Sequence, residues 1–99
     1  MKILITDDEA DIRKVLRLLL TRQGYEVVEA ENGRVALDIL SADRTFDLVI
    51  MDIMMPELTG VEATRRLREI SDVPVLFLTA KSLGRDKASA YAAGGDDYL

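Results

Sequence analysis

Residues 46–52 read Phe-Asp-Leu-Val-Ile-Met-Asp, and this stretch decides the expected fold. Its apolar run predicts a strand over residues 46–51 that is covered on both faces, as the strands of parallel sheets are. Shorter apolar runs predict further strands at residues 3–5, 27–28 and 75–79. A fifth strand would begin with Tyr98-Leu99.

Between these strands, apolar residues recur with the spacing of a helix. Residues 12–20 combine an apolar stripe with basic residues on the other side, and Gly24 provides a helix end. The same spacing predicts helices at about 33–41, 59–70 and 82–93. A strand followed by a helix, four times over, predicts an α/β fold in which helices cover both faces of a parallel sheet.

Length and composition agree with one such domain. The chain has 99 residues, of which 48% are hydrophobic and 31% charged, as in folded globular proteins. Its net charge of −5 argues against direct binding to nucleic acid or an anionic membrane. Cysteine and histidine are both absent, which excludes disulfides, thiol chemistry and a histidine base. Without a signal peptide or a long apolar run, we expect a cytoplasmic location.

Acidic residues follow two of the predicted strands. Asp7 and Asp8 follow the first strand, and Asp52 follows the strand at 46–51. Ligands of such sheets bind outside the carboxyl ends of the strands. If these two strands are neighbours, the three carboxylates repel one another and call for a cation. Oxygen ligands suit Mg²⁺, so the sequence predicts a magnesium site.

A simpler interpretation is that Asp7, Asp8 and Glu9 merely cap the next helix, whose positive end favours acids. Asp52 is harder to explain in this way, because an acid directly after a buried strand is either solvated or functional. Aspartate can accept a phosphoryl group, with Mg²⁺ neutralising the developing charge. Thr79 would then donate its hydroxyl to a phosphoryl oxygen, although threonine is also a common strand residue.

The motifs that carry a family resemblance span nearly the whole chain. They are the pair Asp7-Asp8 and the segments MDIMMPELTG (51–60), PVLFLTA (74–80) and AGGDDYL (93–99). With these motifs the chain resembles the response-regulator receiver domain of two-component signalling systems. The resemblance implies a flavodoxin-like, doubly wound parallel sheet with strand order 2-1-3-4-5.

The resemblance also implies a role for each residue of the metal site. Asp52 would be the phosphoacceptor and a metal ligand, Asp8 a direct Mg²⁺ ligand, and Asp7 a ligand through bound water. The backbone carbonyl of Met54 would complete the set. The phosphoryl donor would be a phosphohistidine of a sensor histidine kinase. Such a domain is no classical enzyme but promotes its own phosphotransfer and dephosphorylation.

A two-state switch follows from the same resemblance. Thr79 would turn toward the phosphoryl group and Tyr98 would rotate inward behind it, changing the surface of the fourth helix and fifth strand. The added charge of about −1.5 to −2 is enough to shift an equilibrium between states a few kcal/mol apart. Met54 and Lys81 would flank the water path to the acyl phosphate and tune its lifetime.

The ending Gly-Gly-Asp-Asp-Tyr-Leu is most similar to the subfamily with a winged-helix DNA-binding output, which regulates transcription. Active receivers of that subfamily pair through the fourth helix, fifth strand and fifth helix. Lys87, Asp96 and Asp97 match charged positions of that interface, although such charges are also typical of a solvated surface.

One departure from the family concerns the C-terminal end. The family continues beyond Leu99 with the rest of strand five, a lysine and a fifth helix, so residues 1–99 are expected to be a C-terminally truncated receiver domain. Without that helix, apolar side chains on one sheet face would meet water. Three explanations stay open: a shortened protein, a tail beyond Leu99, or a homodimer through the uncovered face or through element exchange.

Two other functions stay open beside the signalling switch. The first is an interaction or dimerisation module with the same fold that never cycles phosphate. The second is a phosphohydrolase with an aspartyl-phosphate intermediate. Phosphohydrolases of that kind usually need a second acid two residues after the nucleophile, where this chain has Met54.

Overall fold

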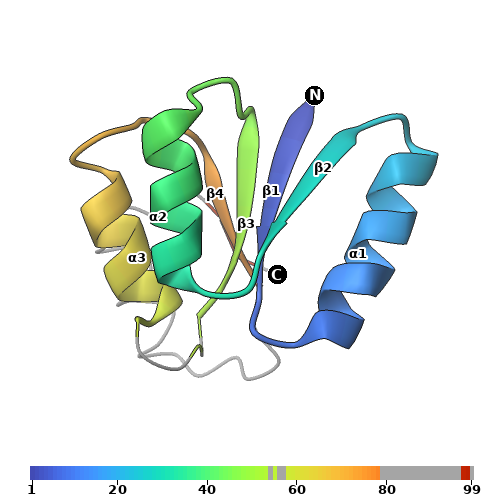
Figure 1. Cartoon of the computed structure of the whole chain (residues 1–99), viewed down its shortest axis with the longest axis horizontal. Coiled ribbons are helices and arrows are strands. Elements are labelled where there is room, and N and C mark those ends of the chain that lie inside the picture. The colour runs from blue at the N-terminus through green and yellow to red at the C-terminus, as the bar shows by residue number, and fades with distance from the viewer. Residues whose placement is uncertain (54, 56–57, 79–96, 99) are drawn as a thin grey trace.

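The computed structural model describes residues 1–53, 55, 58–78 and the backbone of 97–98. Five parallel strands form one sheet in the order β2-β1-β3-β4-β5, which confirms the predicted order. Figure 1 labels β1 to β4. The strands are β1 (Lys2–Thr6), β2 (Glu26–Ala30), β3 (Leu48–Asp52), β4 (Val75–Leu78) and β5 (Asp97–Tyr98).

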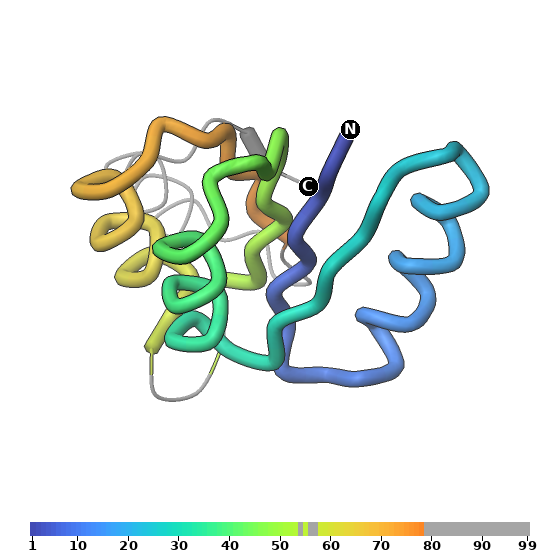
Figure 2. Tube along the Cα trace, turned by 45° about the horizontal axis from the view of Figure 1, so that its top comes forward, coloured from blue at the N-terminus to red at the C-terminus, as the bar shows by residue number. Residues whose placement is uncertain are grey.

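Three described helices cover the sheet, as the sequence predicts. They are α1 (Ala10–Arg22), α2 (Gly33–Ala42) and α3 (Gly60–Leu67). Figure 2 shows α1 on one side of the sheet and α2 with α3 on the other. The helix expected at 82–93 lies outside the described residues. The flavodoxin-like arrangement is therefore present in the described part of the chain.

Local sequence explains where these helices begin and end. Asn32 caps α2, because its side chain accepts a hydrogen bond from the Val35 amide at 2.9 Å. Thr59 caps α3 in the same way through the Glu62 amide, at 3.2 Å. After α1 the chain turns at Gly24, whose φ of +87° favours glycine.

The helix expected over 59–70 is shorter in the structure and ends at Leu67. The next turn is tighter than an α-helix, since the amide of Ile70 donates to the carbonyl of Leu67, three residues earlier, at 2.9 Å.

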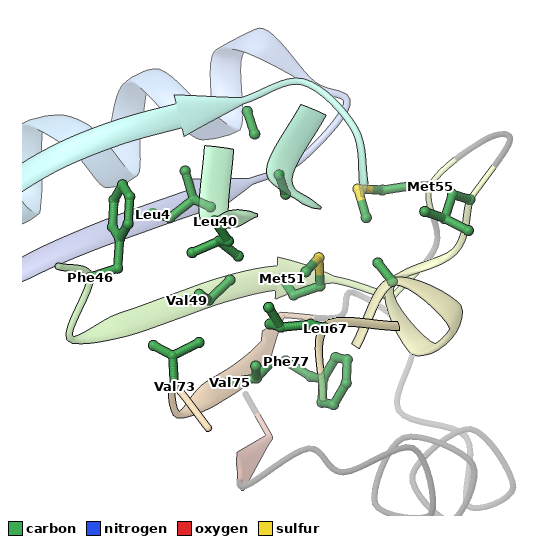
Figure 3. Close-up of a cluster of buried hydrophobic side chains, with 14 of the residues drawn as sticks. Leu4, Leu40, Phe46, Val49, Met51, Met55, Leu67, Val73, Val75 and Phe77 are labelled. Carbon is green, nitrogen blue, oxygen red and sulfur yellow. The ribbon is translucent and has the colours of Figure 1, made fainter. Parts of the chain in front are cut away.

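The larger hydrophobic core lies between the sheet and the pair α2 and α3. Strand residues such as Leu4, Met51 and Phe77 meet Leu40 of α2 and Leu67 of α3 there, all of them fully or almost fully buried (Figure 3). Burial of such side chains is the main favourable term in folding, at about 1.5–3 kcal/mol for each one. This core anchors β1 and β3 side by side.

The opposite sheet face carries a smaller core. Ile3, Ile5, Val27 and Ile50 are buried there, but Leu16 and Leu20 of α1 pack against them only in part. Val15, Leu18 and Leu19 of α1 stay more than half exposed. The exposed apolar side chains of this face thus belong to α1, whereas Ile3, Ile5 and Ile50 of the strands are buried, so the expectation that apolar strand residues meet water is not met at these positions. Among the described residues, no helix is both long and apolar enough to cross a membrane.

Candidate metal centre

The register of the sheet brings the predicted acids together. β1 pairs with β3 so that Thr6 lies opposite Met51. Asp7 directly follows Thr6, and Asp52 directly follows Met51 as the last residue of β3. Carboxylate oxygens of Asp7, Asp8 and Asp52 all lie within 4.8 Å of one another. Two strand ends that are far apart in the sequence thus supply one cluster of oxygen ligands.

The three side chains differ in their access to water. Asp7 is buried, with 2% of its surface exposed, whereas Asp52 is half-buried and Asp8 is exposed. A cation in the cluster would therefore touch the protein on one side and keep water on the other. This is the arrangement that Mg²⁺ prefers, because it gives up its water shell reluctantly.

Burial raises the pKa of Asp7 above its ordinary value of 3.8. The neighbouring charges of Asp8 and Glu9 raise it further, while a hydrogen bond from the Glu9 amide to Asp7 Oδ1, at 2.9 Å, acts in the opposite direction. Without a counterion, the ionised form of Asp7 is therefore less favourable in the folded chain than that of an ordinary aspartate. A bound divalent cation would remove that penalty.

The acidic triplet makes no side-chain capping hydrogen bond to α1. The N-cap residue of α1 is Glu9, and its side chain makes no capping hydrogen bond. Asp7 Oδ1 accepts its hydrogen bond from the amide of Glu9 itself, before the first helical residue. The simpler interpretation thus lacks the hydrogen bond that defines a side-chain cap.

Two residues that contact this site were not singled out from the sequence. Gly60 donates its amide to the carbonyl of Ile53 at 3.0 Å, which seats the start of α3 on the end of β3. Arg13 donates from its guanidinium to the backbone carbonyl of Asp7 at 2.6 Å. The helical pattern places Arg13 on the polar side of α1. The only signal for a contact with the preceding loop is its position one turn after the start of the helix.

The other predicted site residues lie outside what the structure describes. β5 contains Asp97 and Tyr98, but only their backbone is described. The remaining predicted residues outside the described part are Met54, Thr79, Lys81, Lys87 and Asp96.

Residues 3–99 match the sequence model of the response regulator receiver domain family. The chain belongs to this family. It is 47% identical over 98 residues to the transcriptional regulatory protein YrkP of Bacillus subtilis and 42% identical over 98 residues to the transcriptional regulatory protein ResD of the same organism. It is 43% identical over 100 residues to the response regulator MprA of Mycolicibacterium vanbaalenii.

The alignments cover 99%, 99% and 100% of this receiver domain but only 42%, 40% and 43% of YrkP, ResD and MprA. The chain thus spans less than half the length of these curated relatives.

Solved structures confirm the fold. The chemotaxis protein CheY4 of Vibrio cholerae superposes with a TM-score of 0.93 at 36% identity, covering 99% of this chain and 83% of CheY4. The N-terminal domain of a response regulator receiver protein from Methanoculleus marisnigri gives a TM-score of 0.88 at 38% identity, covering 99% of this chain and 81% of that one.

Membership identifies the chain as a signalling domain of two-component systems, as the resemblance implied. Response regulators take phosphoryl groups from sensor histidine kinases. The comparisons favour neither the phosphohydrolase nor the interaction module that never cycles phosphate.

Proposed function

We propose that Asp52 is the phosphoacceptor of this receiver domain and that Asp7, Asp8 and Asp52 hold Mg²⁺ beside it. The observation that carries this proposal is the approach of the three carboxylates to within 4.8 Å at the carboxyl edge of the sheet. Acids so close together repel one another, and a divalent cation compensates them.

The ligand roles are those that the family resemblance implies, and exposure and hydrogen bonding support them. Asp7 is buried and uses Oδ1 to accept a hydrogen bond from the Glu9 amide, which leaves Oδ2 for a water of the hydrated ion. Asp8 is exposed and binds the ion directly. The family resemblance adds the backbone carbonyl of Met54 as a further ligand.

The carboxylate of Asp52 is itself the nucleophile in phosphoryl transfer. One carboxylate oxygen attacks phosphorus, the bond from phosphorus to the imidazole nitrogen breaks, and that nitrogen keeps the electron pair. Mg²⁺ when bound neutralises charge on the phosphoryl oxygens. Asp52 is half-buried at the end of its strand, so a donor reaches its carboxylate while the pairing of β3 with β4, in which Asp52 lies opposite Leu78, holds its backbone. The family resemblance implies that the domain promotes its own phosphotransfer and the later hydrolysis of the acyl phosphate.

The readout of phosphorylation would involve residues outside the described part. Thr79 would bind the phosphoryl group and Tyr98 would follow it inward. The surface of residues 82–93 and β5 would change as a result, with Lys87, Asp96 and Asp97 at an interface between two copies. The transcriptional role named for YrkP and ResD supports residues 1–99 as the receiver domain of a transcription regulator with a DNA-binding output.

The test is phosphorylation by acetyl phosphate in the presence of Mg²⁺, followed by intact mass. We expect one phosphoryl group on the wild-type chain, none on Asp52→Asn, and none on the wild type when EDTA removes the metal. Asp38→Asn is the matched control, because Asp38 is an exposed acid of α2 outside the cluster, and it should be phosphorylated like the wild type.

Phosphate on both the wild type and Asp52→Asn would reject Asp52 as the acceptor. A wild-type chain that binds Mg²⁺ but accepts no phosphate would instead favour the interaction module.

A further inference from the structure

Arg13 joins three elements next to the metal centre. Its side chain extends from the second turn of α1, and only 16% of it is exposed. Nη1 donates to the backbone carbonyl of Asp7 at 2.6 Å, and Nε donates to a carboxylate oxygen of Glu29 in β2 at 3.2 Å. One planar guanidinium therefore bridges the loop after β1 and the neighbouring strand.

The contact with Asp7 orients the peptide that links two of the clustered acids. The carbonyl of Asp7 and the amide of Asp8 belong to one planar unit, so a hydrogen bond to that carbonyl restricts both residues. The amide of Asp7 is also held, because it donates to the carbonyl of Ala30 at 3.2 Å. Hydrogen bonds on both sides of Asp7 thus limit its backbone dihedrals and the direction of its side chain.

Glu29 fixes the guanidinium in turn. Its two carboxylate oxygens accept from Arg13 at 3.2 Å and from Arg17 at 2.8 Å. Arg17 lies one turn further along α1 and is 52% exposed, and its hydrogen bond is to Glu29 rather than to the loop after β1. The two arginines are therefore alike in charge and share Glu29, but Arg13 makes the contact with Asp7.

We infer that Arg13 is a positioning residue for the metal site, which it serves by orienting the peptide between Asp7 and Asp8. This role rests on the proposed binding of Mg²⁺ to those carboxylates. Among the hydrogen bonds of the described residues, no other one joins a side chain of α1 to the loop from Asp7 to Glu9. Restricting the loop before the ion arrives lowers the entropy cost of ordering two ligands at once.

Replacing Arg13 should change the affinity for Mg²⁺ in opposite directions, depending on whether Arg13 acts through its charge or by positioning the loop. Removing a cation from the neighbourhood of an acidic site by itself strengthens binding of Mg²⁺. Loss of the hydrogen bond to Asp7 weakens it, and loss of groups that hold metal ligands typically costs 10–100-fold in affinity. The sign of the change in affinity therefore distinguishes the two.

The experiment is a Mg²⁺ titration by isothermal calorimetry on the wild type, Arg13→Met and Arg17→Met. We expect affinity to fall roughly 10-fold in Arg13→Met and to stay equal or rise slightly in Arg17→Met. In the metal-free proteins, hydrogen exchange at the Asp8 and Glu9 amides should be faster in Arg13→Met alone. Thermal melting in EDTA checks that each variant is folded.

A second pair of variants keeps the charge. Lysine lacks the planar fork that reaches Asp7 and Glu29 together, so Arg13→Lys should bind Mg²⁺ more weakly than Arg17→Lys. This pair decides the question if Arg13→Met does not fold.

Affinity in Arg13→Met equal to or above that of the wild type, or equal affinities in the two lysine variants, would overturn the role of Arg13. A folded wild-type chain that binds no Mg²⁺ would overturn the metal site itself and this role with it.

Discussion

Gly60, the first residue of α3, packs against the backbone of Asp52, the last residue of β3. A Cβ atom at Gly60 would lie 2.1 Å from the carbonyl oxygen of Asp52 and 2.9 Å from Cα of Ile53. Both neighbours are backbone atoms and cannot move aside as a flexible side chain does. The close approach therefore requires glycine at this position and couples the start of α3 to the proposed phosphoacceptor.

Gly60→Ala should destabilise the fold and slow phosphorylation. Alanine is favoured over glycine inside a helix by about 1 kcal/mol, but the clash with Asp52 should outweigh this gain and leave a net loss of roughly 1–3 kcal/mol. Urea denaturation measures the loss of stability. A lower rate of labelling by acetyl phosphate would report that Asp52 is displaced.

Gly33→Ala is the matched control for Gly60→Ala. Gly33 also begins a helix, but the nearest atoms to its added Cβ would include the Ala63 Cβ at 3.0 Å and the Leu58 carbonyl oxygen at 3.2 Å, far less close than the 2.1 Å at Gly60. It should cost less stability and leave the labelling rate nearly unchanged. Equal losses in the two variants would remove the special role of the contact with Asp52.

Asp7→Asn should stabilise the metal-free chain while weakening its affinity for Mg²⁺. Burial raises the pKa of Asp7, so the ionised carboxylate opposes folding at neutral pH. Asparagine keeps the oxygen that accepts from the Glu9 amide but carries no charge. Thermal melting in EDTA should therefore show a higher midpoint than the wild type. A lower midpoint would mean that the Asp7 carboxylate contributes favourable contacts that outweigh its burial.

Much of this fold could be predicted from hydrophobic spacing. The apolar pattern predicts β3, α1 and α2 to within a few residues, because their apolar residues recur with clear periodicity. The local pattern predicts β2 only at residues 27–28, whereas the strand covers Glu26–Ala30, since pairing with β1 extends it through Glu26, Glu29 and Ala30. Pairing of this kind depends on a distant strand and is invisible in the local pattern.

The acids of the candidate site are also predictable from hydrophobic spacing, because this spacing locates the strands that they follow. Asp7, Asp8 and Asp52 follow predicted strands, so the topology alone places them at one edge. Arg13 and Gly60 could not be found in this way, because each acts on backbone atoms of another element. Charge and spacing describe side chains, whereas these two contacts arise only when α1 and α3 dock on the sheet.

Mg²⁺ should stabilise the chain, and acid should abolish this effect. A ligand that binds only the folded state at 100 times its dissociation constant adds about 2.7 kcal/mol. Protons compete with the metal for Asp7, whose pKa lies above 3.8. The Mg²⁺-induced shift in melting temperature should thus shrink as the pH falls toward the folded pKa of Asp7, a higher pH than for an ordinary aspartate.

Two controls accompany this measurement. Asp38→Asn should respond to Mg²⁺ like the wild type, and Asp52→Asn should respond less at every pH. A stabilisation by Mg²⁺ that persists unchanged in Asp52→Asn would place the ion elsewhere on the surface.

Replacing leucine by alanine should cost more stability on one face of the sheet than on the other. Leu67 of α3 is fully buried in the larger core, whereas Leu19 of α1 is 53% exposed. Leu67→Ala should cost about 2–5 kcal/mol through lost burial and a residual cavity. Leu19→Ala should cost less than about 1 kcal/mol, because its side chain is largely in water already. Urea denaturation at several protein concentrations measures both. Comparable losses would mean that the exposed face of α1 is buried in solution, and a loss that grows with concentration would identify a second copy of the chain as what covers it.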